Sequence, residues 1–225
     1  MKLKKCKLNW KSVFHVSHML VTLLIIVLGI VGFIELKALT QENNTSYVIS
    51  IYKENCLLDY YASKQKLVRE VDKYIKSVAP KSCVNGLAIV DACIEYNIDI
   101  KFVLAQGKIE SHFGTAGLAS KTHSIFNVLA YDGRSASDMK KNGHAYSHPD
   151  LSIRPFLKLL TEKYLVNGKT EKNLMKSYVS SSGHRYASNR SYESELTNTY
   201  LEIERTTQIS EYYKEFISYK IIAEQ

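Results

Sequence analysis

Residues 102–128 read FVLAQGKIESHFGTAGLASKTHSIFNV, and this stretch decides the fold expected for the chain. Its first half continues an apolar pattern of helical period that starts after Asp99, a residue type that commonly caps helices, and ends near His112. Its second half opens with FGTAG, and further loop-forming sequences (YDGRS, KNGH and HPD) follow up to residue 150. The stretch therefore predicts an apolar helix whose last turn meets a loop-rich region.

Glu110 lies near the end of this predicted helix, on the same face as Gln106 and Gly107. Glycine inside a helix costs about 1 kcal/mol relative to alanine, so Gly107 indicates that a neighbouring helix or a ligand comes close. A carboxyl group that ends an apolar helix loses hydration, which raises its pKa and suits it to protonate a glycosidic oxygen. From the residues alone, a structural glutamate beside Lys108 or His112 explains the position at least as well.

An apolar stretch near the N-terminus predicts a membrane anchor. Residues 13–34 are 22 residues without Asp, Glu, Lys or Arg, and a helix of this length reaches about 30 Å, one hydrocarbon core. Lysines crowd its N-terminal side, so the positive-inside rule places the N-terminus in the cytoplasm and the rest of the chain outside. A cleaved signal peptide is the alternative, but the exit sequence GFIELKALTQ contains no clear cleavage site.

Composition and charge favour an ordinary globular domain behind this anchor. The chain is 45% hydrophobic and 23% charged, with a net charge of +8. Half of this charge comes from residues 1–36, where five lysines accompany one glutamate. The remaining excess suits an anionic polymer such as a cell wall, but it is too weak to indicate binding of nucleic acid. The histidines between 112 and 148 match no metal-ligand spacing, so we expect no metal and no cofactor.

The helical periods divide the chain into segments. We predict a basic cytoplasmic tail at 1–12, a transmembrane helix at 13–36, a linker at 37–56, a domain at 57–205 and a helical extension at 206–225. Within the domain, 113–150 leaves room for at most a small hairpin. The expected helices cover 57–78, 84–96, 99–112, 151–165 (with Asp150 or Ser152 as its cap), 171–180 and 192–205, and a tail helix follows from Ile209.

Three ordered blocks of the sequence carry a resemblance to a known family. They are residues 102–128, AYSHPDLSIRPFLKLL at 145–160, and RYASNRSYESEL at 185–196. Together they resemble the glucosaminidase family of peptidoglycan-cleaving enzymes. The resemblance implies a mainly α, lysozyme-like helical domain with a reduced hairpin or loop lobe, here preceded by one transmembrane helix. It also implies hydrolysis of β-1,4 linkages at N-acetylglucosamine in peptidoglycan strands.

The resemblance further implies roles for individual residues. Glu110 matches the catalytic acid, Tyr186 the tyrosine that lines the cleft, and Phe126 the aromatic residue of the sugar-binding loop. On this basis we predict that the substrate contacts Gln106, Ser111, Ser124, Phe126, Asn127, Tyr146, Tyr186 and Tyr192.

Two departures from the family pattern leave the second catalytic group open. The family sequence Asn-Asn-Leu-Phe-Gly is replaced by His-Ser-Ile-Phe-Asn at residues 123–127, although histidine and serine can still bind an acetamide. No glutamate occurs between 128 and 150, where the family usually carries a hairpin with one. Asp138 and Asp132 are the candidates, though Asp132 also suits the turn YDGR. Without a second carboxylate, the substrate's acetamide can assist, or cleavage can form an anhydro product.

The expected partners are therefore peptidoglycan strands and, through the N-terminal helix, a membrane. Lytic transglycosylase cleavage is an alternative reaction, and a lysozyme-like module that holds glycan without cutting it is an alternative of another class. The sequence leaves the oligomeric state open.

Overall fold

The computed structural model describes residues 10–128, 135–176, 189 and 191–223, which form helices and loops and contain no β-strand. The prediction of a mainly α chain is confirmed. The chain divides into two compact units, Met1–Cys56 and Leu57–Gln225. Helix α1 (Trp10–Val78) contributes residues to both.

The stretch predicted as a linker, residues 37–56, is helical in the structure as part of α1. No glycine or proline occurs between Glu35 and Val78, so nothing in the backbone interrupts the helix. The polar residues of the stretch each cost only a few tenths of a kcal/mol in a helix. The end of α1 at Val78, before Pro80, confirms the predicted boundary.

The first unit exposes apolar side chains along α1. The large hydrophobic residues between Leu23 and Ile34 are 47–64% exposed. Among the residues with described side chains, no helix combines the length and apolarity that a membrane span requires. The predicted anchor begins at Val13, and the side chains of 13–22 lie outside the described residues.

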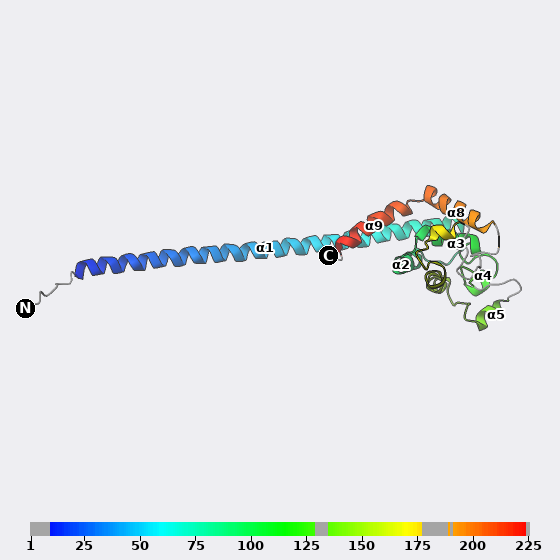
Figure 1. Cartoon of the computed structure of the whole chain (residues 1–225), viewed down its shortest axis with the longest axis horizontal. Helices are drawn as coiled ribbons and strands as arrows, with labels where there is room; N and C mark the ends of the chain where they lie inside the picture. Colours follow the sequence, from blue (N-terminus) through cyan, green and yellow to red (C-terminus); the bar gives the residue numbers. More distant parts are fainter. Residues whose placement is uncertain (1–9, 129–134, 177–188, 190, 224–225) are drawn as a thin grey trace, which may run out of the picture. The chain divides into compact units, whose positions relative to one another are not determined.

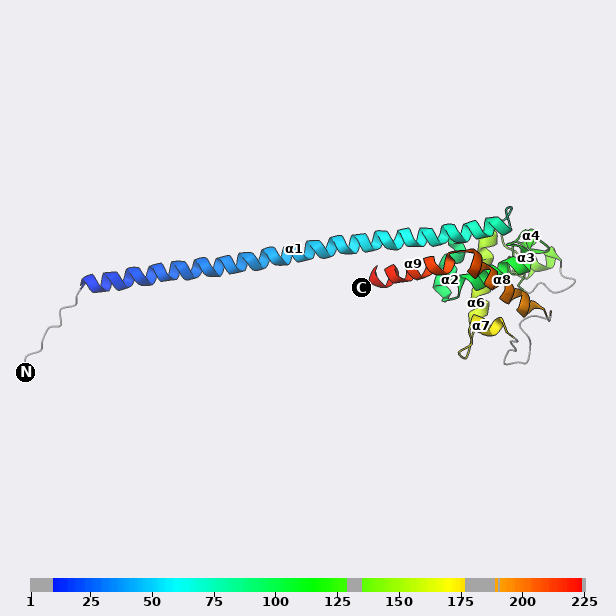
Figure 2. The same ribbon diagram turned by 90° about the horizontal axis from the view of Figure 1, so that it is seen from above.

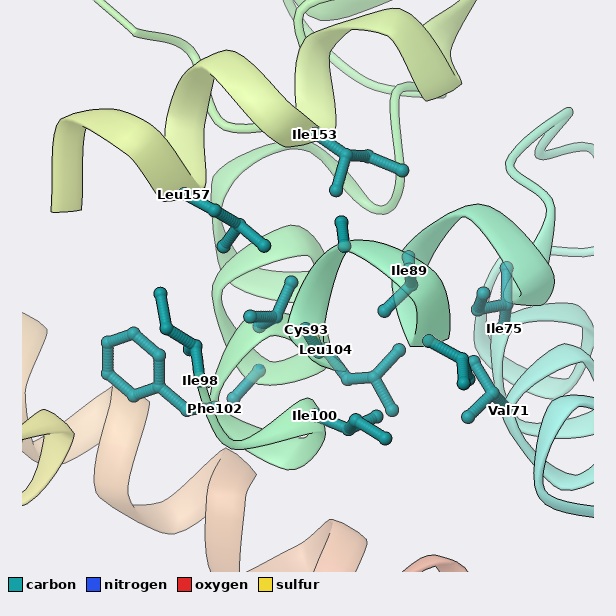
Figure 3. Close-up of a cluster of buried hydrophobic side chains, with 14 of the residues drawn as sticks. Val71, Ile75, Ile89, Cys93, Ile98, Ile100, Phe102, Leu104, Ile153 and Leu157 are labelled. Carbon is teal, nitrogen blue, oxygen red and sulfur yellow. The ribbon is translucent and has the colours of Figure 1, made fainter. Parts of the chain in front are cut away.

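The core of the second unit forms where α2 (Gly86–Tyr96), α3 (Ile100–Ser111) and α6 (Ile153–Leu159) meet the last turns of α1. Figure 3 shows side chains from all four helices converging, among them Val71, Ile75, Ile89, Cys93, Leu104 and Leu157. Residues 102–107 of α3 are all buried. This burial confirms that the stretch opening at Phe102 forms the central helix of the fold.

Local capping explains where α2 and α3 begin. The Asn85 side chain accepts a hydrogen bond from the Leu87 amide at 2.9 Å, so α2 starts at Gly86, two residues later than predicted. The predicted cap of α3 is confirmed, because the Asp99 carboxylate accepts a hydrogen bond from the Lys101 amide at 2.9 Å.

The region after α3 is loop-rich, as predicted, and its described part contains two short helices, α4 (Ala119–Thr122) and α5 (Ala136–Lys141). Residues 129–134 lie outside the described residues, and the flanking stretches form no hairpin. The helix predicted at 151–165 is a succession of the 3₁₀ turn η1 (Pro149–Ser152), α6 and the π turn η2 (Leu160–Tyr164).

The cap predicted for that helix is wrong. The imidazole of His148 accepts the hydrogen bond of the Asp150 amide at 3.4 Å. The Ser152 hydroxyl instead donates to the Pro149 carbonyl at 2.7 Å. It also accepts the Ile125 amide at 3.2 Å, so it links this turn to the loop that follows α3.

The remaining helices are α7 (Glu171–Leu174), α8 (Tyr192–Thr206) and α9 (Ile209–Ala223). Residues 177–180 of the helix predicted at 171–180 lie outside the described residues, whereas α8 and α9 match their predictions. Figures 1 and 2 show α9 beside the part of α1 that follows Leu57.

Specific contacts hold α9 against α1. Lys66 of α1 bonds Glu215 of α9 at 2.7 Å, and its ammonium group lies 4.3 Å from the centre of the Tyr212 ring. The rings of Tyr60 and Phe216 pack with their centres 5.3 Å apart.

The turn that follows α3 explains Gly107. His112, Phe113 and Gly114 all have positive φ angles (48°, 52° and 80°), which reverses the chain and folds the Phe113 ring back against α3. A Cβ atom on Gly107 would lie 2.9 Å from Cε1 of this ring and 3.4 Å from Cγ2 of Ile125. A close approach at Gly107 is confirmed, but the neighbour is the Phe113 ring from the turn after the same helix, and not the neighbouring helix or ligand that was predicted.

We expect Gly107→Ala to lower the melting temperature of the domain. The substitution gains about 1 kcal/mol of helix propensity, but it overpacks a fully buried ring at a typical cost of 1–3 kcal/mol. A net loss of about 1 kcal/mol lowers the melting temperature by about 2–4 °C in a domain of this size. Gly32→Ala is the matched control, because a Cβ there meets nothing within 4 Å. A higher melting temperature for Gly107→Ala would contradict the packing described.

Candidate active site

Glu110 is held in the last turn of α3 by groups from two other segments. The Tyr192 hydroxyl, in the first turn of α8, lies 2.7 Å from Oε1 of Glu110. Nδ2 of Asn127, in the loop after α4, donates to the backbone carbonyl of Glu110 at 2.6 Å. Helix α8 packs against α3, which brings Tyr192 to an acid 82 residues earlier in the chain.

The environment of Glu110 favours its protonated form. Burial raises the pKa of this carboxyl above its usual value, and the hydrogen bonds of Tyr192 and Asn127, which stabilise the charged form, offset part of that rise. The place of Glu110 in the last turn of α3 also favours a raised pKa, because the C-terminal end of a helix carries partial negative charge. The predicted raised-pKa carboxyl is therefore present at the end of a buried helix.

Tyr192 contacts a second residue of the same helix face. Its hydroxyl oxygen also lies 2.7 Å from Oε1 of Gln106, whose side chain is 1% exposed. The sequence predicted that Gln106 and Tyr192 contact the substrate, and the structure places both in a hydrogen-bonded group with Glu110. Because this contact depends on how α8 packs on α3, no local sequence pattern predicts it.

Ser111 joins α3 to the neighbouring loops. Its hydroxyl donates to the Ile125 carbonyl at 2.6 Å and accepts the Gly114 amide at 2.8 Å. The residue is 2% exposed. Both hydrogen bonds of Ser111 lie in the protein interior, and its contact with the substrate stays a prediction.

Asn127 occupies the position where the family motif has glycine. Its φ angle is +48°, in the left-handed region that glycine and asparagine adopt most easily. The Glu110 carbonyl that it caps is one of the α3 carbonyls without a partner inside the helix. Asn127 thus combines a backbone conformation that glycine also adopts with a side chain that bonds the last turn of α3.

Several polar atoms near this turn are buried without a partner among the described residues. They are Nε2 of Gln106, Oγ of Ser124 and Oδ1 of Asn127. Buried polar atoms are normally hydrogen-bonded. The substrate contacts of Gln106, Ser124 and Asn127 stay predictions.

The structure describes the surroundings of two aromatic residues that are predicted to contact the substrate, Phe126 and Tyr146. The Phe126 ring is 5% exposed and stacks on Phe156, with centres 3.9 Å apart and planes inclined by 11°. This ring therefore packs in the core, and its predicted contact with the substrate stays a prediction. Tyr146 is half-buried; its amide donates to the Thr122 carbonyl at 2.8 Å, and its own carbonyl lies 2.9 Å from Nδ1 of His123.

Of the two candidates for a second carboxylate, Asp138 has a structural role and Asp132 lies outside the described residues. Both Ser135 groups, its amide and its hydroxyl, donate to the Asp138 carboxylate, which forms the capping box of α5. Asp132 and the predicted cleft residue Tyr186 lie outside the described residues. Within the described part of the chain, no group of three metal-ligating side chains comes together.

Comparison with known families agrees with this geometry. Residues 86–205 match the model of the Glucosaminidase family, described as mannosyl-glycoprotein endo-beta-N-acetylglucosaminidase. The chain belongs to the glucosaminidase family. A comparison with curated proteins finds no match. The matched range runs from the first residue of α2 almost to the end of α8, so it contains Glu110, Asn127 and Tyr192 and leaves out α9.

We expect Glu110→Gln to stabilise the folded protein at neutral and higher pH. With a raised pKa in the folded state, Glu110 is protonated in both states well below 4.5, its ordinary value, and the substitution then changes little. As the pH rises through the folded-state pKa, the wild-type protein must bury a charge that the unfolded chain hydrates, and stability is lost. Thermal melts over a range of pH measure the difference.

Glu95→Gln is the control for these melts. Glu95 pairs with Arg154 on the surface, where both side chains are about half exposed. An equal pH dependence in both variants would show that the desolvation of Glu110 is not the source.

Proposed function

We propose that this glucosaminidase-family protein hydrolyses β-1,4 glycosidic bonds at N-acetylglucosamine in peptidoglycan, with Glu110 as the general acid. Family membership supports a peptidoglycan-hydrolase-type glycosidase. The observation that carries the finer assignment is the partly buried carboxyl of Glu110, whose pKa is raised and which is hydrogen-bonded to Tyr192. The helical domain is consistent with the lysozyme-like fold that the family resemblance implies.

In the proposed reaction Glu110 gives its proton to the glycosidic oxygen while the bond from that oxygen to C1 of the sugar breaks. The resulting carboxylate then accepts a proton from the attacking water. Positive charge that develops at C1 needs a partner, and the capping contacts of Asp138 favour the substrate's own acetamide for this task. The acetamide oxygen attacks C1, and water opens the resulting ring to a reducing end.

A lytic transglycosylase outcome uses the same acid. There the bond at C1 of N-acetylmuramic acid breaks, the C6 hydroxyl of that same sugar attacks C1 in place of water and gives its proton to the Glu110 carboxylate, and the product carries an anhydro end. This second candidate is favoured by the same observation, the engagement of Asp138 in the cap of α5.

Digestion of purified peptidoglycan by the full-length chain tests the proposal. We expect soluble fragments with reducing N-acetylglucosamine ends, which mass spectrometry distinguishes from anhydromuramyl ends. Glu110→Gln should lower the rate by about 10²–10⁴, the usual contribution of general acid catalysis. Glu95→Gln, an equal change at an exposed helical glutamate, should keep the wild-type rate.

Each result of this digestion has a definite reading. Anhydromuramyl ends among the products would show that the enzyme is a lytic transglycosylase and not a hydrolase. Equal activity of Glu110→Gln and wild type would remove Glu110 as the acid. Binding of peptidoglycan without any cleavage would favour the non-catalytic glycan-binding module.

We further propose that the N-terminal helix anchors the protein in a membrane as a single-pass segment. The N-terminus would then be cytoplasmic and the glucosaminidase domain would face the cell wall. The support is the stretch 13–34, which lacks charged residues, and the lysines that precede it. The exposure of the apolar side chains from Leu23 to Ile34 on α1 is compatible with a lipid environment.

Membrane fractionation tests the anchor. We expect the full-length chain to stay in the pellet after alkaline carbonate extraction and to dissolve in detergent. Replacing Leu24 and Leu28 by lysine should release it, because a charged residue at the centre of a span costs about 2.5–3.5 kcal/mol. Lys37→Gln, beyond the apolar stretch, is the control. Release of the unchanged chain by carbonate would contradict the anchor.

A further inference from the structure

We propose that Gln106 is a positioning residue that acts through Tyr192 to set the charge state of Glu110. The amide group of Gln106 rotates by about 180° when Glu110 loses its proton. The inference rests on the proposed role of Glu110 as the acid. It adds a function for two residues that the sequence assigned only to substrate contact.

The contacts of Tyr192 limit where the protons between Glu110 and Gln106 can lie. The Tyr192 oxygen lies 2.7 Å from Oε1 of Glu110 and 2.7 Å from Oε1 of Gln106. A tyrosine hydroxyl has a single proton, so it donates to only one of these two oxygens. The other contact needs a proton from its own side, and an amide oxygen carries none. The carboxyl of Glu110 supplies it when protonated.

The observed orientation of Gln106 therefore matches the acid form. Protonated Glu110 donates to the Tyr192 oxygen, and Tyr192 donates to Oε1 of Gln106. Each proton in this chain has an acceptor. The orientation does not suit a charged carboxylate, which needs Tyr192 as its donor and would leave two oxygens, of Tyr192 and Gln106, facing each other without a proton.

Rotation of the Gln106 amide by 180° restores a complete chain for the charged form. Nε2 then donates to the Tyr192 oxygen, and Tyr192 donates to the carboxylate of Glu110. The rotation gives up no other bond, because Nε2 has no partner among the described residues although Gln106 is 1% exposed. The two orientations thus differ, within the described structure, only in what they offer to Tyr192.

This chain of hydrogen bonds serves both halves of the proposed reaction. When Glu110 gives its proton to the glycosidic oxygen, Tyr192 keeps its own proton and turns it from Gln106 to the new carboxylate. No proton travels along the chain, so the balance of the reaction is unchanged. The carboxylate is stabilised until it accepts a proton from water, and the starting orientation then returns.

Other titratable groups surround Glu110 on the elements that meet it. On α3 and its end these are Lys108, which bonds Glu202 at 2.7 Å, and His112; in the loop it is His123; and in the first turn of α8 they are Glu193 and Glu195. The described causes of the Glu110 pKa shift are burial, Tyr192 and Asn127, and none of these charged groups is among them. Tyr192 contacts both Glu110 and Gln106, so we take it as the link through which Gln106 acts.

A carboxyl titration tests the chain without relying on enzyme activity. The full-length protein, labelled with ¹³C-glutamate and kept in detergent, is titrated by NMR, and Glu110→Gln identifies the Glu110 signal. Gln106→Glu keeps an acceptor for the Tyr192 proton in the acid form but removes the Nε2 donor that the charged form needs. The Glu110 midpoint should rise by roughly 0.5–1 pH unit, the effect of one ordinary hydrogen bond.

Two further variants separate this chain from a packing effect. In the Tyr192→Phe background, Gln106→Glu should raise the midpoint by less, because only the added charge then acts on Glu110. Gln106→Met, which removes one hydrogen bond from each charge state, should leave the midpoint close to that of the wild type. Tyr200→Phe is the matched control on α8, because the Tyr200 hydroxyl donates to Asp99 at 2.7 Å, at the other end of α3; it should leave Glu110 unchanged.

The results decide the two proposals separately. An unchanged midpoint in Gln106→Glu, or an equal shift of that variant in the Tyr192→Phe background, overturns this chain of hydrogen bonds whatever the enzyme activity. The expected shifts in a protein that does not cleave peptidoglycan would uphold the chain and remove only the proposed reaction. Thermal melts establish that each variant is folded during its titration.

Discussion

The loss of water around the Glu110 carboxyl is the constraint on which the site depends. Helix α3 is buried over residues 102–107, and its last turn carries the carboxyl out of this core at the helix end, where partial negative charge adds to the effect of burial. A carboxyl in such a place needs polar partners in either charge state. Asn127 of the loop at 123–127 and Tyr192 of the first turn of α8 supply them.

The loop at 123–127 departs from the family pattern at two positions that have positive φ angles in this chain. Asn127 stands where the motif has glycine, and its positive φ angle is one that asparagine adopts readily. His123, in place of the first asparagine of the motif, also has a positive φ angle, 54°, and its ring contacts the Tyr146 carbonyl. Both residues add side-chain bonds to backbone carbonyls of other segments.

The sequence predicts those features that are set by neighbours along the chain. The Asp99 cap, the close approach at Gly107 and the apolar face of α3 all follow from spacing and propensity. The stacking of Phe126 on Phe156, the use of Ser111 inside the protein and the reach of Tyr192 to Glu110 depend on packing between segments far apart in sequence. The helix at 37–56 has a different cause, because its polar composition suggested a linker although no residue breaks the helix.

The capping of α5 by Asp138 makes the protonation of Glu110 more important to the proposed chemistry. In a glycosidase with two carboxylates, the second one stabilises charge at C1, and the two groups share the acid and base work through their different environments. If the substrate's acetamide takes the place of the second carboxylate, a single residue must be an acid first and a base afterwards. Such a residue cannot be stabilised in one charge state alone. A tyrosine between a carboxyl and an amide meets this requirement, because the amide presents an acceptor on one side and a donor on the other. A fixed cation would favour only the charged form, and an apolar wall only the neutral one.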